Sequence, residues 1–166
     1  VEEYLIDPSR ILLVTFSRAA AKEMIHRVHQ LIGPVKMYAG TFHALSSQIM
    51  RERAPMEMKD QPFIDEIPYR LVKWLETADA KKWVKRFQTI IVDEFQDINE
   101  IQWKLLKGFY HPGATMSIVG DDAQNIYTWR GSSVDFILNF HNKIAEVTDY
   151  QLCRNYRSTE AIVTIA

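Results

Sequence analysis

In Thr89-Ile90-Ile91-Val92-Asp93-Glu94-Phe95-Gln96-Asp97, four strand-forming residues run straight into two adjacent carboxylates. A continuous apolar run of this length is typical of a strand buried on both faces, as in parallel sheets. Ligands of open α/β sheets bind at the carboxyl ends of such strands. The sequence therefore predicts that Asp93 and Glu94 stand where a buried strand meets solvent.

Two interpretations of this carboxylate pair are open from these nine residues. Hard cations such as Mg²⁺ often sit between one or two carboxylates and the phosphates of a substrate. A second carboxylate beside a metal ligand can orient and deprotonate an attacking water. The alternative is a solvated acidic turn after a strand, which is common in proteins.

The composition is that of an ordinary globular domain. The chain has 166 residues, 47% hydrophobic and 25% charged, which is enough for one core. Its net charge of −1 gives no overall basic field, so a nucleic-acid partner has to be argued from local residues. No apolar run is long enough to span a bilayer. The single cysteine, Cys153, excludes an internal disulfide framework and favours a reducing, cytoplasmic location.

Strand and helix patterns alternate along the rest of the chain. Further strands are predicted at residues 11–16, 35–39, 116–120 and, with a more exposed pattern, 145–152. Helices are predicted at residues 1–6, 18–32, 44–53, 69–76, 80–87, from 99 to about 110, 134–140 and from 158 onward. Residues 54–65 are expected to form a connector. This alternation predicts a three-layer α/β fold with a parallel sheet and right-handed crossovers.

Polar clusters follow four of the predicted strands, and in a parallel sheet all four fall at the same edge. They supply carboxylates, an amide, arginines and an aromatic ring, an inventory that suits a nucleoside triphosphate. The clusters are Thr15 to Arg18, Asp93-Glu94, Gly120 to Gln124 and Arg154 to Ser158.

A second group of residues is aromatic. Aromatic side chains in turns or at helix starts, close to basic residues, suit stacking on unpaired nucleobases. Taken singly, each is more often a core residue. Taken jointly, they favour a path for a single strand: Phe16, Phe42, Tyr127 and Trp129, with Arg18, His43 and Arg130 beside them.

These residues resemble the motifs of UvrD/Rep-like superfamily 1 DNA helicases. Five motifs occur in family order and cover most of the chain apart from residues 54–86. They are motif Ia at Thr15 to Ala20, motif Ib at Gly40 to Ala44, motif II (Walker B) at Val92 to Asp97, motif III at Val119 to Gly131, and motif IV at Asn155 to Ser158. The resemblance implies a RecA-like P-loop NTPase fold for residues 1–166, as part of the first motor domain, 1A.

The resemblance also implies roles for individual residues around ATP and Mg²⁺. Asp93 would hold the metal and Glu94 would activate the hydrolytic water. Gln124 and Arg157 would contact the γ-phosphate, and Tyr156 would stack on adenine. The implied partners are single-stranded DNA and duplex junctions, contacted by Thr15, Phe16, Arg18, Thr41, Phe42, His43, Tyr127, Trp129 and Arg130, the last also coupling the two sites.

Two departures from the family pattern bear on the function. The Walker A loop, which ends in Gly-Lys-Thr or Gly-Lys-Ser, is absent from these residues, so the chain looks like a fragment that lacks this loop and its strand. The segment 54–86 is short, so the helical 1B insertion of larger family members looks minimal or trimmed. We therefore expect the fragment itself to be inactive.

Two functions of different classes follow. The first is a piece of the motor domain of an ATP-dependent DNA helicase, which would translocate on single-stranded DNA and unwind duplex DNA. The second is a catalytically silent nucleic-acid-binding or regulatory domain that kept the fold. The presence of both Asp93 and Glu94 favours the first, and a Walker A loop in the parent protein would decide between them.

Overall fold

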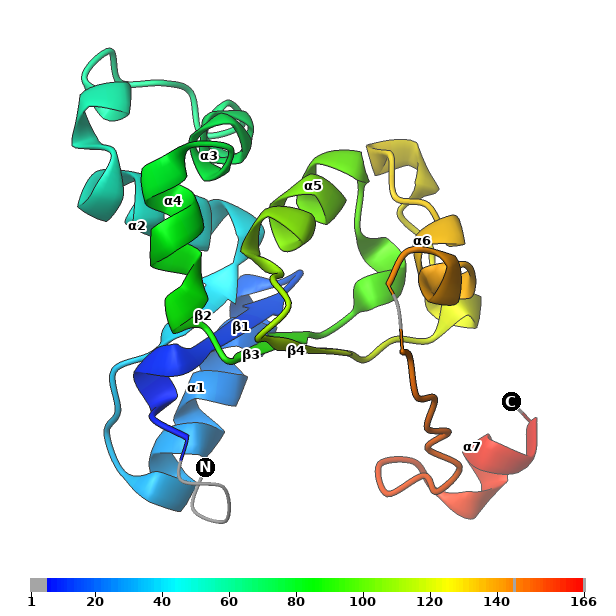
Figure 1. The fold of residues 1–166 in the computed structure, drawn as a ribbon. Helices are drawn as coiled ribbons and strands as arrows, with labels where there is room; N and C mark the ends of the chain where they lie inside the picture. The colour runs from blue at the N-terminus through cyan, green and yellow to red at the C-terminus, as the bar shows by residue number, and fades with distance from the viewer. Residues whose placement is uncertain (1–5, 145, 166) are drawn as a thin grey trace.

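A parallel sheet of four strands forms the centre of the computed structural model, which describes residues 6–144 and 146–165, without the side chain of Arg130 (Figure 1). The strand order is β2-β1-β3-β4. In the register, Leu13 of β1 lies opposite Ala39 of β2 and Ile91 of β3. The strands are β1 (Ile11–Thr15), β2 (Tyr38–Thr41), β3 (Thr89–Val92) and β4 (Thr115–Ile118).

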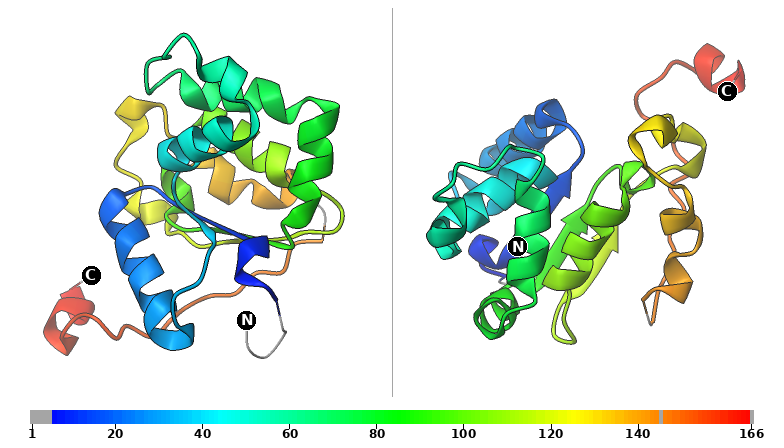
Figure 2. Two further views of the ribbon diagram at one scale, coloured as in Figure 1. Left: turned by 90° about the vertical axis from the view of Figure 1, so that its left-hand side faces the viewer. Right: turned by 90° about the horizontal axis from the view of Figure 1, so that it is seen from above.

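Helices cover both faces of this sheet, which confirms the predicted α/β class. Figures 1 and 2 show α1 (Arg18–Ile32) against one face, and α2 (Phe42–Arg53), α3 (Ile67–Leu75), α4 (Ala78–Trp83) and α5 (Glu100–Phe109) on the other side. The short helices α6 (Asp135–Leu138) and α7 (Glu160–Ile165) follow. None of the helices within the described ranges is both long and apolar enough to cross a bilayer.

Burial differs between the two central strands. All five residues of β1 are buried, as the apolar pattern predicts. In β3, Ile90 and Val92 are fully buried, but Thr89 and Ile91 are half-exposed. The prediction that this strand is buried on both faces is therefore wrong for the described chain. The reason is that α1, the helix on that face, packs mainly on β1 and β2.

The core lies between the sheet and the layer formed by α2 to α5. Rings from different elements meet there edge to face, as Phe87 does with Tyr38, Trp83 and Phe109 at centroid distances of 5.3, 5.2 and 6.0 Å. The helix α3 contributes Ile67, Leu71 and Leu75 to the same buried cluster. Residues 67–86 are thus part of the main core, while residues 54–66 form an exposed connector with one 3₁₀ turn at Pro55–Met58.

The predicted helix starts are largely confirmed by their caps. Ser17 Oγ accepts a hydrogen bond from the Ala20 N–H at 3.0 Å. Asn99 and Gln102 form a reciprocal capping box at the start of α5. Boundaries shift by a few residues elsewhere: the strand predicted at 35–39 is β2, and the helix predicted at 134–140 shortens to α6. The helix predicted at residues 1–6 lies almost wholly outside the described residues.

The strand predicted at 145–152 is the largest error. Residues 146–152 form no strand, and Tyr150 and Leu152 are each 86% exposed. An alternating pattern indicates a segment that could join a sheet, but a strand forms only when another strand lies beside it. Within the described chain, residues 146–152 pair with no strand.

Gly108 provides a test of how tightly α5 packs on α3. A Cβ at this position would lie 2.8 Å from Cδ1 and 3.1 Å from Cβ of Leu75, which is 4% exposed. Alanine is favoured over glycine inside a helix by about 1 kcal/mol, yet we expect Gly108→Ala to destabilise the protein. The overlap should lower the free energy of unfolding by about 1–3 kcal/mol, measured by thermal unfolding. In a Leu75→Ala background the contact with Cδ1 is removed and only the contact with Cβ remains, so the same substitution should cost less. Additive effects of the two substitutions would contradict the close packing of α5 on α3.

Candidate functional site

Asp93 continues the hydrogen-bonded ladder beyond the end of β3. Its N–H donates to the Val14 carbonyl oxygen at 2.9 Å, and the Val119 N–H donates to the Val92 carbonyl oxygen at 2.8 Å. These bonds hold the ends of β1, β3 and β4 together. The Asp93 side chain is therefore half-buried at the carboxyl edge of the sheet, where the sequence placed it.

Glu94 turns the chain sharply at this edge. Its backbone is left-handed, with φ 54° and ψ 44°, a conformation that is costly for a residue with a Cβ. The next residue, Phe95, is fully buried, and its N–H donates to the Val119 carbonyl oxygen at 3.0 Å. Its ring packs against Phe140 and Trp103 at 5.4 and 6.2 Å. The burial of Phe95 thus holds the strained turn, which leaves the Glu94 side chain exposed.

Three carboxylates crowd this turn. Burial raises the pKa of Asp93, and the negative charge of Glu94 raises it further. Burial, and then the charge of Glu94, raises the pKa of Asp97, whose Oδ1 is buried and has no hydrogen-bond partner among the described residues. A cation at this edge would relieve the repulsion. Because the described residues contain no ready cluster of three metal ligands, such a cation would need oxygens from a substrate or water.

Gln96 connects this turn to the end of β4. The side chain is 1% exposed. Its Nε2 donates to Glu94 Oε2 at 2.8 Å, and its Oε1 accepts a hydrogen bond from the Asp121 N–H at 3.1 Å. Its carbonyl oxygen accepts a hydrogen bond from Nδ2 of Asn125. Gln96 and Asn125 lie within sequence motifs II and III, but the resemblance predicts no role for either of them.

Gln124 lies in the turn that follows β4, as predicted. It is exposed, and its Nε2 donates to Asp121 Oδ2 at 2.8 Å. Asp121 Oδ1 also accepts from the Ala123 N–H at 3.1 Å. Asp121 therefore holds Gln124 at the edge that carries Asp93.

Three of the predicted aromatic residues form a row, which consists of Phe16, Tyr127 and Trp129. The Phe16 and Tyr127 rings stack with centroids 5.0 Å apart and planes 28° apart, and Trp129 lies 6.4 Å from Tyr127. Trp129 is 73% exposed, so it is a surface residue and not part of the core. Arg18 is exposed at the start of α1. The Arg130 side chain, also predicted here, lies outside the described part.

The remaining residues predicted to contact DNA are in part buried and in part accessible to solvent. Thr15 is 1% exposed and Phe42 is 5% exposed, so both side chains face the core and offer no surface to a ligand. Thr41 accepts from the Ala44 N–H at 3.3 Å and caps α2. His43 is half-exposed, with Nε2 3.6 Å from Oδ1 of Asp65. Near β2, Thr41 and His43 thus remain available to a ligand.

The structure does not bring Tyr156 and Arg157 to the carboxyl edge. Tyr156 is 82% exposed, and the Arg154 guanidinium lies 4.9 Å from its ring centroid. Arg157 is exposed in a turn closed by Asn155 Oδ1. Figure 1 shows this segment leading away from the sheet to α7. Since residues 146–152 form no strand, three of the four predicted clusters meet, and the fourth does not.

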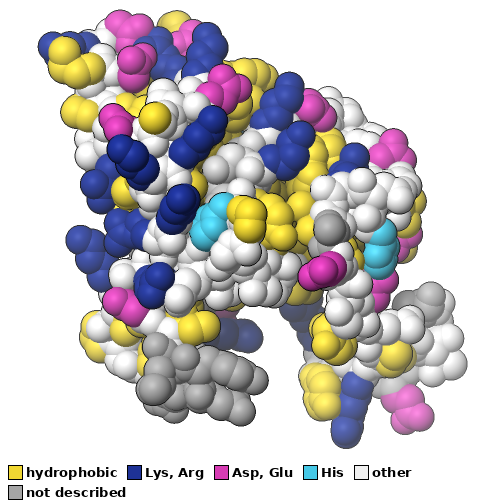
Figure 3. All heavy atoms as spheres, in the orientation of Figure 1, with side chains coloured by type: hydrophobic (Ala, Val, Ile, Leu, Met, Phe, Trp, Pro, Cys, Tyr) yellow, Lys and Arg dark blue, Asp and Glu magenta, His cyan; other side chains and the backbone are white. Residues whose placement is uncertain are grey.

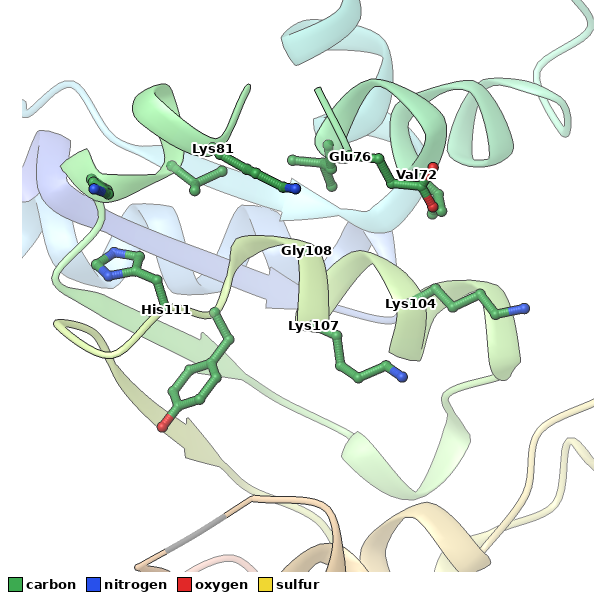
Figure 4. Close-up of a pocket in the computed structure, with 11 residues that line it drawn as sticks. Val72, Glu76, Lys81, Lys104, Lys107, Gly108 and His111 are labelled. Atoms are coloured by element: carbon green, nitrogen blue, oxygen red, sulfur yellow. The ribbon is translucent and has the colours of Figure 1, made fainter. Parts of the chain in front are cut away.

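A separate groove of about 640 Å³ lies between α3, α4 and α5 (Figure 4). Four of its lining residues are lysines: Lys81, Lys85, Lys104 and Lys107. Figure 3 shows basic side chains gathered on this side of the molecule. His111 lines the groove and donates to the Phe87 carbonyl oxygen at 3.0 Å, where both residues precede strands. The groove therefore belongs to the amino end of the sheet and contains none of the predicted site residues.

Both a protein family and individual relatives match this chain. The UvrD/REP helicase N-terminal domain family matches residues 1–66 and 57–145. DNA helicase II of Escherichia coli (strain K12) is 28% identical over 240 aligned residues, which cover 96% of this chain and 33% of the relative. The probable DNA helicase II homolog of Mycoplasma capricolum is 26% identical over 252 residues, which cover 100% of this chain and 35% of the relative.

A shorter and more similar match is the putative ATP-dependent DNA helicase YjcD of Bacillus subtilis, 42% identical over 94 residues, or 56% of this chain and 12% of the relative. The chain spans about a third of the length of the two DNA helicase II relatives. Their aligned stretches are longer than its 166 residues, so these relatives contain segments that it lacks. Because the family match covers most of the chain and includes the carboxyl edge of the sheet, the chain belongs to the UvrD/REP helicase N-terminal domain family.

Proposed function

We propose that this chain is part of the ATP-binding motor domain of an ATP-dependent DNA helicase, which translocates on single-stranded DNA and unwinds duplex DNA. One observation carries the proposal. The Asp93-Glu94 pair and the aromatic row occupy the same edge of the sheet and are joined by the hydrogen bonds of Gln96 and Asn125. Chemistry on a phosphate and contact with a nucleic acid can therefore be linked there.

Asp93 is the residue we propose for Mg²⁺. A half-buried carboxylate crowded by a second negative charge gains from a nearby cation. Mg²⁺ usually binds one or two carboxylates, with the remaining positions taken by water and substrate phosphates, which fits a site with few protein ligands. When bound with ATP, the ion would neutralise charge on the phosphates.

Glu94 is the residue we propose as general base. It is exposed, next to the proposed metal ligand, and its carboxylate is oriented by Gln96. An oriented carboxylate can take a proton from an attacking water. We propose Gln124 as a contact of the γ-phosphate. For Tyr156 and Arg157, the roles of adenine stacking and γ-phosphate contact rest on motif IV alone and would require their segment to move to the carboxyl edge.

The aromatic row is the proposed binding surface for single-stranded DNA. Base stacking on exposed aromatic rings tolerates any sequence, because every base has a π face. Arg18, Thr41 and His43 lie exposed or half-exposed in neighbouring elements and would contact the strand or its phosphates. A role for Arg130 rests on motif III. The buried residues Thr15 and Phe42 would support this surface from the core.

We further propose that residues 54–86 are a minimal or trimmed form of the helical 1B insertion, which touches duplex DNA in larger family members. Within this segment Ile67, Leu71 and Leu75 pack into the common core. A cytoplasmic location stays a prediction. The alternative is a silent domain that kept the fold, and a Gly-Lys-Thr or Gly-Lys-Ser loop in the parent protein would support the motor over this alternative.

Asp97 allows a test of the carboxylate crowding. Its folded pKa is raised above the ordinary value of 3.8, so the folded protein binds more protons than the unfolded one between the two pKa values. Stability from this group is present below the unfolded pKa and is lost as the pH rises through the folded pKa. We expect Asp97→Asn to raise the melting temperature at neutral pH and to change it little at about pH 3.5. Equal shifts at both pH values would contradict a raised pKa of Asp97 in the folded protein.

Glu94→Gln tests the proposed function in the full-length gene product. The substitution keeps the shape and the hydrogen-bond acceptor for Gln96 but removes the base. DNA-stimulated ATP hydrolysis should fall by about 10²–10⁴-fold, whereas nucleotide binding should persist. The measurements are steady-state phosphate release and binding of a fluorescent ATP analogue. Near-normal turnover would show that Glu94 is not the base, and absence of ATP hydrolysis in the unmodified protein would favour the silent domain.

Trp129→Ala tests the DNA surface. Because Trp129 is exposed, the melting temperature should change little, and affinity for oligo-dT should weaken by about 1–3 kcal/mol, with little dependence on base sequence. Fluorescence anisotropy at one fixed salt concentration gives the dissociation constant. Tyr150→Ala is the matched control, since Tyr150 is 86% exposed in the segment 146–152, outside the row. Equal losses in both variants, or unfolding of Trp129→Ala, would contradict the assignment.

A further inference from the structure

We propose that Gln96 is a positioning residue that transmits contact at the aromatic row to the Glu94 carboxylate. The inference rests on the proposed function, in which Glu94 is the base and the row binds single-stranded DNA. It adds a specific physical connection between the two, made by a side chain that touches neither proposed ligand.

The hydrogen bonds of Gln96 dictate which way its amide faces. A backbone N–H can only donate, so the atom facing the Asp121 N–H must be the amide oxygen. The amide nitrogen then faces Glu94 and donates to its carboxylate. At 1% exposure, a flipped amide would leave two groups unsatisfied without access to water. The side chain therefore has one stable orientation, and this orientation holds Glu94.

Glu94 depends on this contact for its side-chain position. Within the described residues, the hydrogen bond from Gln96 Nε2 is the one that its carboxylate accepts. The residue is exposed, so packing places little restriction on its rotamer. A donor from a buried amide to a carboxylate is a strong and directional contact. Loss of this donor would leave the carboxylate free to rotate among several positions.

The other end of the connection is the segment 121–132, which carries Tyr127 and Trp129. Asp121 N–H bonds to the Gln96 side chain, and Asn125 Nδ2 bonds to its carbonyl oxygen. The same Asn125 nitrogen donates to Ser132 Oγ at 3.2 Å, which ties the far end of the segment to the same point. One end of the loop that holds two members of the aromatic row therefore bonds directly to Gln96, and the other end is connected to it through Asn125.

Close packing leaves little slack in this connection. A Cβ on Gly120 would lie 2.6 Å from Gln96 Oε1 and 3.2 Å from its backbone nitrogen. The chain leading into the segment 121–132 thus passes directly against Gln96. A displacement of this segment by bound DNA would move Gln96, because no gap exists to absorb it. The Glu94 carboxylate would move with its donor.

The test uses the full-length gene product and two substitutions of Gln96. Gln96→Leu removes both side-chain hydrogen bonds, and Gln96→Glu keeps an oxygen for the Asp121 N–H but has no donor for ionised Glu94. We expect the kcat of oligo-dT-stimulated ATP hydrolysis to fall at least about 10-fold in both, because the general base loses its orientation. The KM for ATP and the dissociation constant for oligo-dT should stay within about twofold, as neither ligand touches Gln96.

Two companion variants separate positioning from general destabilisation. Gln102→Leu is the matched control: Gln102 is also buried, at 6% exposure, but serves the capping box of α5. It should lower the melting temperature and leave kcat unchanged. Asn125→Ala cuts the connection on the loop side and should lower the ratio of DNA-stimulated to basal hydrolysis.

The outcomes of these experiments separate the role of Gln96 from the proposed function. Normal kcat in Gln96→Glu, beside an inactive Glu94→Gln, would overturn the role of Gln96 and leave the proposed function standing. Parallel changes in kcat, KM and oligo-dT affinity in both Gln96 variants, or the same kcat loss in Gln102→Leu, would reduce Gln96 to a structural residue. Normal turnover in Glu94→Gln would overturn both proposals together.

Discussion

The parallel pairing of β1 with β3 is the contact on which the other features of this fold depend. Residues 11–14 and 89–92, distant in the sequence, lie side by side with Val14 opposite Val92. In β3 the fully buried Ile90 and Val92 alternate with the half-exposed Thr89 and Ile91, so a shift of one residue would exchange the buried and the half-exposed side chains. This register determines that Asp93, the residue after β3, donates its N–H to Val14 and stands beside the end of β1.

The turn after β3 combines a strained backbone conformation at Glu94 with the fully buried side chain of Phe95. The backbone of Glu94 is left-handed. Burial, and then the negative charge of Glu94, raises the pKa of Asp93 and Asp97. Such strain persists where surrounding contacts overdetermine the conformation. Here Phe95, packed between Trp103 and Phe140, offsets the cost. The arrangement lowers stability locally while it presents carboxylates at an edge that a cation could occupy, as is common at functional sites.

Local patterns predicted most elements of the fold because their causes are local. The Ser17 cap, the Asn99-Gln102 capping box and the apolar run 11–15 act through neighbouring residues, and the structure contains all three. Patterns failed where the outcome depended on distant partners. Residues 146–152 alternate like a strand, but they meet no strand to pair with among the described residues. Phe42 was predicted to contact DNA from the surface, but its side chain is buried. Burial depends on which distant segments pack against a residue, and the local sequence does not contain this information.

The candidate site divides in the same way. The residue types of the motifs and their order along the chain indicated the family, the carboxylate pair and the exposed Trp129, since strand ends and turns can be recognised from neighbouring residues. The tertiary structure alone decided that Tyr127 stacks on Phe16 from another element, and that Gln96 bonds to both Glu94 and Asp121. It also decided that motif IV stands apart from the other three clusters. Hydrogen bonds and ring contacts between distant segments depend on register and on the direction of side chains, and these are set by packing of the whole sheet and not by any local pattern.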